Sequence, residues 1–334
     1  MFNIAVAGHV CADLTPKLPL GIGMTPGHLY DVGPLTINPG GCIVNVGRVL
    51  HALDASPRLA GMVGDDDLGR AVVRDIAGTG LDTSEIRVSD GSGTSYSIVI
   101  EPAGMNRSFW HHTGANGEFD GTGVDLAGID LLHVGYPSLV PGLLTDDGAP
   151  LVALMQRARR EGVTTSLDLA VVDQTSPIGQ LDWHGILART LPEVDVFSPS
   201  LDDLTSALET GPVSTKEGLL ALADEMIEAG AGIVMLSAGE DGLLVRVASA
   251  ERLAAGGRVL ESLSDAWAGS TSWAPARDIA QVVTTNGAGD SASAGLLYGI
   301  ASGLGPEQAA GTATLVASQW IQGLPIAAGG AGRN

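Results

Sequence analysis

Lysine is nearly absent from this 334-residue sequence, and positive charge in general is scarce. The only lysines are Lys17 and Lys216, and neither ends a Gly-x4-Gly-Lys-Ser/Thr run, so a P-loop is excluded. Seventeen basic residues against 38 acidic ones give a formal net charge of −21, which disfavours nucleic acid and anionic membrane surfaces as partners. A phosphate-binding site must therefore use backbone amides, arginine or a metal ion.

Cysteines, aromatic residues and long apolar runs are also few. Two cysteines, Cys11 and Cys42, provide neither a disulfide framework nor a cysteine metal site, and no signal peptide or 18-residue apolar run is visible. We therefore expect a cytoplasmic protein. Aromatic residues make up 4% of the chain and hydrophobic residues 45%, with 47 glycines, which favours an aliphatic α/β core over a β-sandwich.

The sequence does contain a glycine-rich turn that leads directly into a helix. Gly287, Ala288 and Gly289 carry little bulk, so successive N–H groups can converge on one anion, and a helix expected to begin near Asp290 adds its positive end. We expect Asp290 at the rim of this cradle, kept ionised by the helix dipole and able to accept a hydroxyl proton. The motif suggests phosphoryl transfer to an alcohol, although a plain turn capped by Asp290 fits these residues equally well.

The order of the predicted elements indicates a parallel sheet. A buried strand at residues 3–8 ends in glycine, and Asp13 follows just past it, at the end of a strand where open α/β sheets bind ligands. From residue 129 onward strands and helices alternate, which implies a parallel sheet wrapped by helices. Further strands are expected at residues 58–64, 129–134, 163–169, 194–197 and 233–236, and helices after Gly41 and at 65–78, 151–160, 216–229, 290–302 and 306–322.

Two segments are expected outside the main sheet. Residues 15–39 are rich in proline and glycine and indicate a loop or small excursion. Residues 94–110 indicate a hairpin that turns at 104–107 and ends at His111-His112. Neighbouring residues on a strand face opposite sides, so we do not expect these histidines to share a metal ion.

Three groups of polar residues can be explained by structure alone, although the first two also have a functional interpretation. Asn45 suits a sugar hydroxyl because an amide donates and accepts, but it also fits a polar residue on the exposed side of a helix. The acidic run 65–67 complements a helix dipole, an interpretation we favour over a metal site. Ser214 and Glu217 are expected to form a capping box for the 216–229 helix.

Three motifs occur in the order found in the PfkB/ribokinase family of carbohydrate kinases, which the chain resembles over nearly its whole length. They are Gly40-Gly41 with Asn45, the run Gly61-Met62-Val63-Gly64-Asp65-Asp66, and Gly287-Ala288-Gly289-Asp290. The resemblance implies one ribokinase-like α/β domain over residues 1–334, with a doubly wound, mostly parallel sheet flanked by helices. It also implies a small β lid formed by segments of about 11–38 and 92–113.

The resemblance further implies a reaction and roles for individual residues. The enzyme would use ATP and Mg²⁺ to phosphorylate a hydroxymethyl group of a sugar, with Asp290 as base and the 287–289 amides stabilising the transferring phosphoryl group. The acceptor is assigned to Asp13, Gly40, Gly41, Asn45, Asn106 and Arg107, the nucleotide to Ser200, Ser237, Gly239 and Gly242, and the metal to Asp203. A homodimer joined through the lid is a further expectation.

Several positions depart from the family pattern. Thr284 stands where an aspartate commonly opens the last motif, and Gly311 stands where an asparagine often lies near the adenine. Ser200 and Asp203 replace an asparagine and a glutamate, which leaves metal affinity and nucleotide choice open. Cys42 replaces a lysine that ribokinase-like members often carry, which argues against ribose as the acceptor.

Other functions remain to be weighed against a sugar kinase. A nucleoside kinase of the same family needs aromatic residues to stack a base, and the expected lid offers Tyr30, Tyr96, Phe109 and Trp110. A sugar-binding regulator without turnover is suggested by the altered 200–203 segment, although the intact Asp290 opposes it. An oxidoreductase is disfavoured because no Gly-x-Gly-x-x-Gly follows the first strand.

Overall fold

The computed structural model contains two sheets. It describes residues 2–19, 22, 25–100, 108–263 and 265–328. The strands of the larger, nine-stranded sheet are β1 (Asn3–Gly8), β4 (Ser56–Gly64), β5 (Asp82–Ser89), β8 (Leu131–Gly135), β9 (Thr164–Asp168), β10 (Val196–Phe197), β11 (Ile233–Ser237), β12 (Leu243–Val247) and β13 (Thr271–Ala274). Their spatial order is β13-β12-β11-β10-β9-β8-β1-β4-β5. All pairs are parallel except the two that β12 makes with β11 and β13, so the mostly parallel sheet that the sequence predicts is confirmed.

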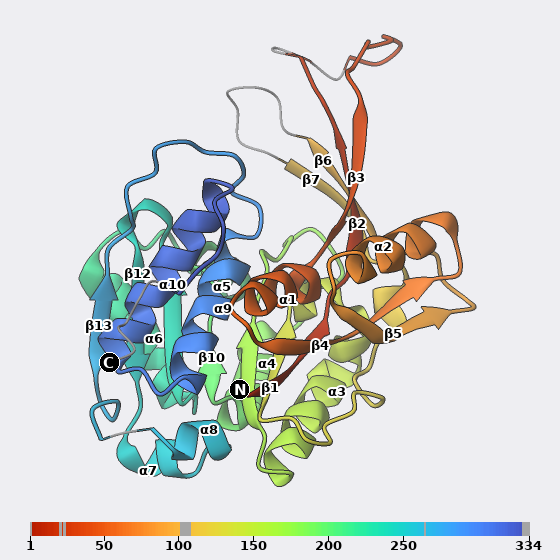
Figure 1. The fold of residues 1–334 in the computed structure, drawn as a ribbon. Helices are drawn as coiled ribbons and strands as arrows, with labels where there is room; N and C mark the ends of the chain where they lie inside the picture. The colour runs from red at the N-terminus through yellow and green to blue at the C-terminus, as the bar shows by residue number, and fades with distance from the viewer. Residues whose placement is uncertain (1, 20–21, 23–24, 101–107, 264, 329–334) are drawn as a thin grey trace.

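Helices cover both faces of this sheet (Figure 1). One face carries α1 (Cys42–Ala52), α2 (Asp67–Ala77), α7 (Ala250–Ala254), α8 (Arg258–Glu261), α9 (Ala288–Ala301) and α10 (Pro306–Ile321). The other carries α3 (Pro141–Arg160), α4 (Trp183–Thr190), α5 (Leu201–Leu208) and α6 (Lys216–Glu228). Ile4 and Val6 pack into the first core and Ala5 and Ala7 into the second, because side chains alternate along a strand. In the ranges described, no helix is both long and apolar enough to span a bilayer.

The direction in which the chain fills the sheet reverses at β1. From β1 the chain goes to β4 and β5 on one side, and then returns to β8 on the other side and continues outward to β13. In open α/β sheets, ligands bind in the crevice at the carboxyl ends of the strands flanking such a reversal. Those strands end here at Gly8 and Gly135.

The second sheet projects away from the main one and is built from the two segments expected outside it (Figure 1). Its order is β3-β2-β6-β7, with β2 (Cys11–Pro16), β3 (Leu35–Gly40), β6 (Tyr96–Ile100) and β7 (Ser108–His112). The excursion expected over residues 15–39 is confirmed, but the segment is not a loop at its two ends, where β2 and β3 pair. Its Pro39 is tolerated since β3 is an edge strand. Asn106 and Arg107 lie outside the described residues.

Helix caps account for one further error. The side chain of Thr215, not Ser214, accepts the first-turn N–H of α6, from Gly218. The predicted capping box of Ser214 and Glu217 is therefore wrong by one residue. The acidic run 65–67 does begin α2, where Asp66 caps the helix through the N–H of Gly69.

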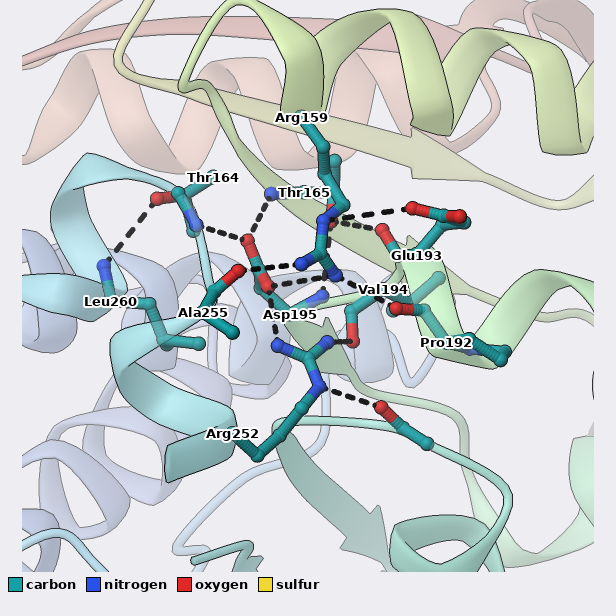
Figure 2. A network of polar contacts seen from close by, with 12 residues as sticks. Arg159, Thr164, Thr165, Pro192, Glu193, Val194, Asp195, Arg252, Ala255 and Leu260 are labelled. Carbon is teal, nitrogen blue, oxygen red and sulfur yellow. Dashed lines mark hydrogen bonds and ion pairs between the residues drawn. The ribbon is translucent and has the colours of Figure 1, made fainter. Parts of the chain in front are cut away.

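At the amino-terminal end of the strands, a buried carboxylate ties several segments together (Figure 2). Asp195, just before β10, has no exposed surface and accepts hydrogen bonds from the N–H groups of Thr165 and Gly257. The Arg252 guanidinium donates to it at 3.0 Å, and Arg159 lies 3.8 Å away. A buried charge is tolerated only with such partners. The network fixes the end of the sheet opposite the crevice.

Candidate active site

We call the carboxyl ends of the central strands at the reversal point the crevice, because open α/β sheets bind ligands there, and three residues mark it. His9 follows β1, Tyr136 follows β8 and Asp168 ends β9. The His9 and Tyr136 rings lie 5.9 Å apart between centroids. Tyr136 adopts φ 62°, a left-handed conformation that costs roughly 1–3 kcal/mol outside glycine and is often found at functional sites. Sequence reasoning missed all three residues, although their places at strand ends could have indicated them.

Asp290, expected at the rim of the anion cradle, lies fully buried next to this crevice. Helix α9 begins at Ala288 with Gly287 as its N-cap, so Asp290 is in the first turn and does not cap the helix. Its side chain is fully buried, and its Oδ2 accepts a hydrogen bond from Asn45 Nδ2 at 2.9 Å. Oδ1 has no partner within the described part of the chain. Asn45 is itself buried, which excludes the exposed-helix interpretation.

The carboxyl groups near the crevice are harder to ionise than the sequence indicates. Burial raises the pKa of Asp290 to about 6, and contacts with Asn45, Tyr136 and Cys42 oppose the rise. Burial, and then the charges of Asp290 and Asp203, also raise the pKa of Asp168. A pKa of about 6 still leaves Asp290 ionised near pH 7, as expected, but losing hydration affects the carboxylate more than the helix dipole does.

Gly287 and Gly289 differ in their surroundings: Gly287 is closely packed in a left-handed conformation, and Gly289 faces open space. Gly287 has φ 80°, and a Cβ there would approach Asn45 Nδ2 to 3.1 Å and the Trp320 ring to 3.2 Å. At Gly289 a Cβ would meet no atom of the described residues within 4 Å, so the space before the first turn of α9 is open. Because the first N–H groups of a helix have no partner inside it, this opening can accept an anion.

The expected acceptor residues gather on the other side of the crevice. A Cβ at Gly40 would collide with the Asp13 carboxylate, and one at Gly41 would approach the His9 ring to 2.9 Å, so these glycines allow β3 and α1 to pack closely. Asp13 accepts a hydrogen bond from Asn286 Nδ2 at 3.2 Å, which links the second sheet to the segment before α9. Asp13, Gly40, Gly41 and Asn45 are thus brought together with Asp290.

The residues expected to bind nucleotide and metal lie near the ends of β10 and β11. Ser237 ends β11 and pairs with Ser200 in an isolated bridge. Gly239 and Gly242 bound the turn that follows, with φ of 57° and 91°. Asp203 accepts hydrogen bonds from the Ser200 N–H at 3.0 Å and hydroxyl at 2.5 Å, and so caps α5. Burial raises the pKa of Asp203 to about 6.

Comparison with known proteins identifies the family to which the chain belongs. The family model for pfkB family carbohydrate kinases matches residues 1–324. The chain belongs to this family. It is therefore an ATP-dependent carbohydrate kinase, as the glycine and aspartate motifs predict.

Relatives and solved structures span the whole fold. Fructoselysine 6-kinases from Shigella flexneri and Escherichia coli (strain K12) are each 26% identical over 326 residues, covering 96% of this chain and 98% of the relative. A ribokinase from Arabidopsis thaliana, complexed with ribose and ATP, superposes with a TM-score of 0.74 at 18% identity, covering 96% of this chain and 93% of that one. A Burkholderia thailandensis nucleoside kinase, in complex with inosine, gives 0.66 at 20% identity, covering 95% and 91%. The predicted ribokinase-like fold is confirmed.

Proposed function

We propose that this kinase transfers the γ-phosphoryl group of ATP to a hydroxymethyl group of a sugar, with Asp290 as base and the first-turn amides of α9 as anion cradle. The observation that carries the proposal is the position of Asp290. Its carboxylate is buried, held by Asn45 through Oδ2 and unpartnered at Oδ1, beside the open first turn at Gly289. A base and an anion site thus lie within one helical turn.

The reaction that fits this geometry needs positioning more than a strong base. Phosphoryl transfer passes through a loose transition state, so charge neutralisation and alignment supply most of the catalysis. The acceptor oxygen bonds to the γ-phosphorus as the bond to the ADP oxygen breaks, and its proton passes to Asp290 Oδ1. The hydrogen bond from Asn45 orients the carboxylate for this step.

Mg²⁺ fits the acidic side chains on the nucleotide side. Asp168 is buried and Asp203 half-buried, and the charge of Asp203 helps to raise the pKa of Asp168. No three His, Cys, Asp or Glu side chains of the described residues converge to form a metal cage. Mg²⁺ does not require one, because it usually keeps several waters and takes one or two carboxylates with substrate phosphates. Asp203 would help to hold the ion, which when bound neutralises phosphate charge.

A panel assay tests the function. Purified protein with ATP is offered fructose, ribose, fructoselysine and inosine, with ADP formation and product mass as readouts and an EDTA arm for the Mg²⁺ requirement. The proposal expects one or more sugars to be phosphorylated. Turnover of inosine alone would overturn it in favour of a nucleoside kinase. Sugar binding without any turnover would instead support a regulator.

Asp13 and Asn45 should act on the acceptor rather than on ATP. Alanine at Asp13 should weaken acceptor binding by roughly 1–3 kcal/mol, the cost of leaving a buried partner unpaired. Alanine at Asn45 should do the same and also lower kcat, because Asn45 holds Asp290. Calorimetric Kd values for acceptor and ATP check this, with Asn3→Ala as control, because Asn3 is exposed at the opposite, amino-terminal end of β1. Weaker ATP binding with normal acceptor binding would contradict the placement.

Turnover should fall as the pH drops through about 6. A base must be ionised to accept a proton, and Asp290, with its raised pKa of about 6, is protonated below that value. We expect kcat/KM to drop about tenfold per pH unit on the acid side. A pH–rate profile between roughly pH 4.5 and 8 measures it, and an acid limb near the ordinary aspartate value of about 4 would argue against Asp290.

We also propose that two copies associate through the second sheet, which acts as a lid. Its edge strand β3 exposes Leu35 and Ile37 by 53% and 43%, and β7 exposes Trp110 by 46%. Exposed apolar edges favour pairing with another strand. Sedimentation should show a dimer that Ile37→Lys dissociates. A monomer at micromolar concentration would refute this association and leave the kinase assignment unaffected.

A further inference from the structure

Two histidines from different sheets contact each other where the second sheet meets the end of β1. His9 follows β1 of the main sheet, and His111 lies on β7 of the second sheet, with 5.1 Å between the ring centroids in an edge-on arrangement. Strand pairing puts His111 beside Ser97 and Ser97 beside Asp13, so the three side chains form one row on the same face. His111 Nδ1 lies 2.9 Å from Ser97 Oγ. The expected acceptor residue Asp13 and the unexpected His111 therefore share a surface.

Unpartnered polar atoms concentrate at this place. Six buried side-chain nitrogen or oxygen atoms in the described part of the chain lack a hydrogen-bond partner, and four of them belong to His9, His111 and Asp290. They are both ring nitrogens of His9, Nε2 of His111 and Oδ1 of Asp290. Folded proteins pair nearly all buried polar groups, because an orphan costs roughly 1–3 kcal/mol. A cluster of such atoms where the second sheet meets the ends of the central strands indicates that a polar ligand completes them.

The protonation state of His9 and His111 indicates which kind of polar ligand suits them. Burial lowers the pKa of His111 to about 4 and that of His9 well below its usual value, so both rings are neutral near pH 7. A neutral imidazole offers one donor and one acceptor, which is what a hydroxyl group also offers. An anionic ligand group would find no positive charge on these rings and would meet the Asp13 carboxylate in the same row.

We propose that His9 and His111 select the acceptor by hydrogen bonding to oxygen substituents of an uncharged polyhydroxylated sugar whose reacting hydroxyl lies at Asp290. The inference rests on the proposed function and adds specificity-determining residues to it. Because one histidine comes from each sheet, a sugar that contacts both also fixes the second sheet over the crevice.

Binding measurements without ATP test the pair independently of turnover. Calorimetry or thermal shift first ranks fructose, ribose, fructoselysine and inosine on the wild-type protein. His111→Ala should then weaken the best sugar about 10-fold to 100-fold, as expected for losing a buried partner. His112→Ala is the matched control, because it changes the same residue type on the same strand but on the opposite face, where His112 lies beside Tyr96. Its Kd should equal that of the wild type.

Two conservative variants separate sugar binding from a structural role. In His111→Asn the amide corresponds in position to Nδ1 and can keep the Ser97 contact, whereas in His111→Gln it reaches the position of the unpaired Nε2. The proposal expects glutamine to restore much of the sugar affinity and asparagine to restore little. If His111 only holds Ser97, asparagine should be the better replacement, and that result would overturn the proposal.

His9 gives a second, independent signature. Because both of its ring nitrogens are buried without partners, His9→Leu should leave Tm unchanged or raise it, while sugar binding weakens at least about 10-fold. A lower Tm with unchanged sugar Kd would show a structural histidine and overturn the proposal. If these variants lose sugar binding selectively but the wild type transfers no phosphoryl group, the role of the two histidines is supported and the kinase reaction is rejected. If no sugar binds the wild type, both are rejected.

Discussion

Asp290→Asn should reduce kcat by roughly 10²–10⁴-fold, the usual contribution of a general base. Asparagine has nearly the same shape, so it can keep contact with Asn45 through one amide atom, and the buried site loses a charge that is costly there. Folding and the Kd values of ATP and sugar should therefore change little. Single-turnover kinetics, together with thermal melting, measure the two effects separately.

A control variant must show that losing a carboxylate elsewhere does not reduce kcat. Asp67→Asn is a suitable control, because Asp67 is an exposed aspartate in the first turn of α2. It should retain wild-type kcat. Near-normal turnover in Asp290→Asn would remove Asp290 from the chemistry, and the acid limb of the pH profile would then need another origin.

Gly289→Val should lower turnover with ATP by roughly 10²–10³-fold, comparable to losing one donor of an anion hole. The new side chain would fill the space in front of the α9 first turn that a phosphate group must enter. Folding should be unaffected, because no atom of the described residues lies within 4 Å of the added Cβ and the backbone there needs no positive φ. Stability should even rise slightly, since valine favours a helix more than glycine.

The comparison variant is another glycine with open space around it. Gly211→Val, between α5 and α6, should melt and turn over like the wild type. Gly287→Val is unsuitable as a test, because strain at φ 80° and contact with Asn45 would confound binding with folding. If Gly289→Val phosphorylates sugar normally, the phosphate site is not at the start of α9.

The sequence predicted those parts of the site that depend on local patterns. The glycine turn before Asp290 and the Gly40-Gly41 pair are contiguous motifs whose backbone needs are visible in the sequence, and the alternation of elements predicted the parallel sheet. Helix α9, however, begins at Ala288, two residues earlier than expected, with Gly287 as its N-cap at φ 80°. Asp290 therefore lies in the first turn of the helix, where it is buried, and does not cap it.

Properties that depend on distant segments could not be predicted. The raised pKa of Asp290 reflects burial beside α1, and nothing near Asp290 in the sequence shows that burial. His9 and His111 are about a hundred residues apart and become neighbours only when the second sheet stands over β1. The predicted roles of Ser200 and Asp203 are complicated for the same reason, since they also cap a short helix that periodicity did not show.

The hydrogen bond from Asn286 to Asp13 connects the expected sugar site with the segment before the phosphate cradle. Asn286 donates to the second sheet through its side chain, and its carbonyl accepts from the Trp320 indole of α10 at 2.7 Å, immediately before the phosphate cradle. A sugar that engages Asp13 therefore acts on the same short segment as ATP. Thermodynamic linkage then imposes reciprocity: whatever factor the sugar applies to the Kd of ATP, ATP must apply to the Kd of the sugar.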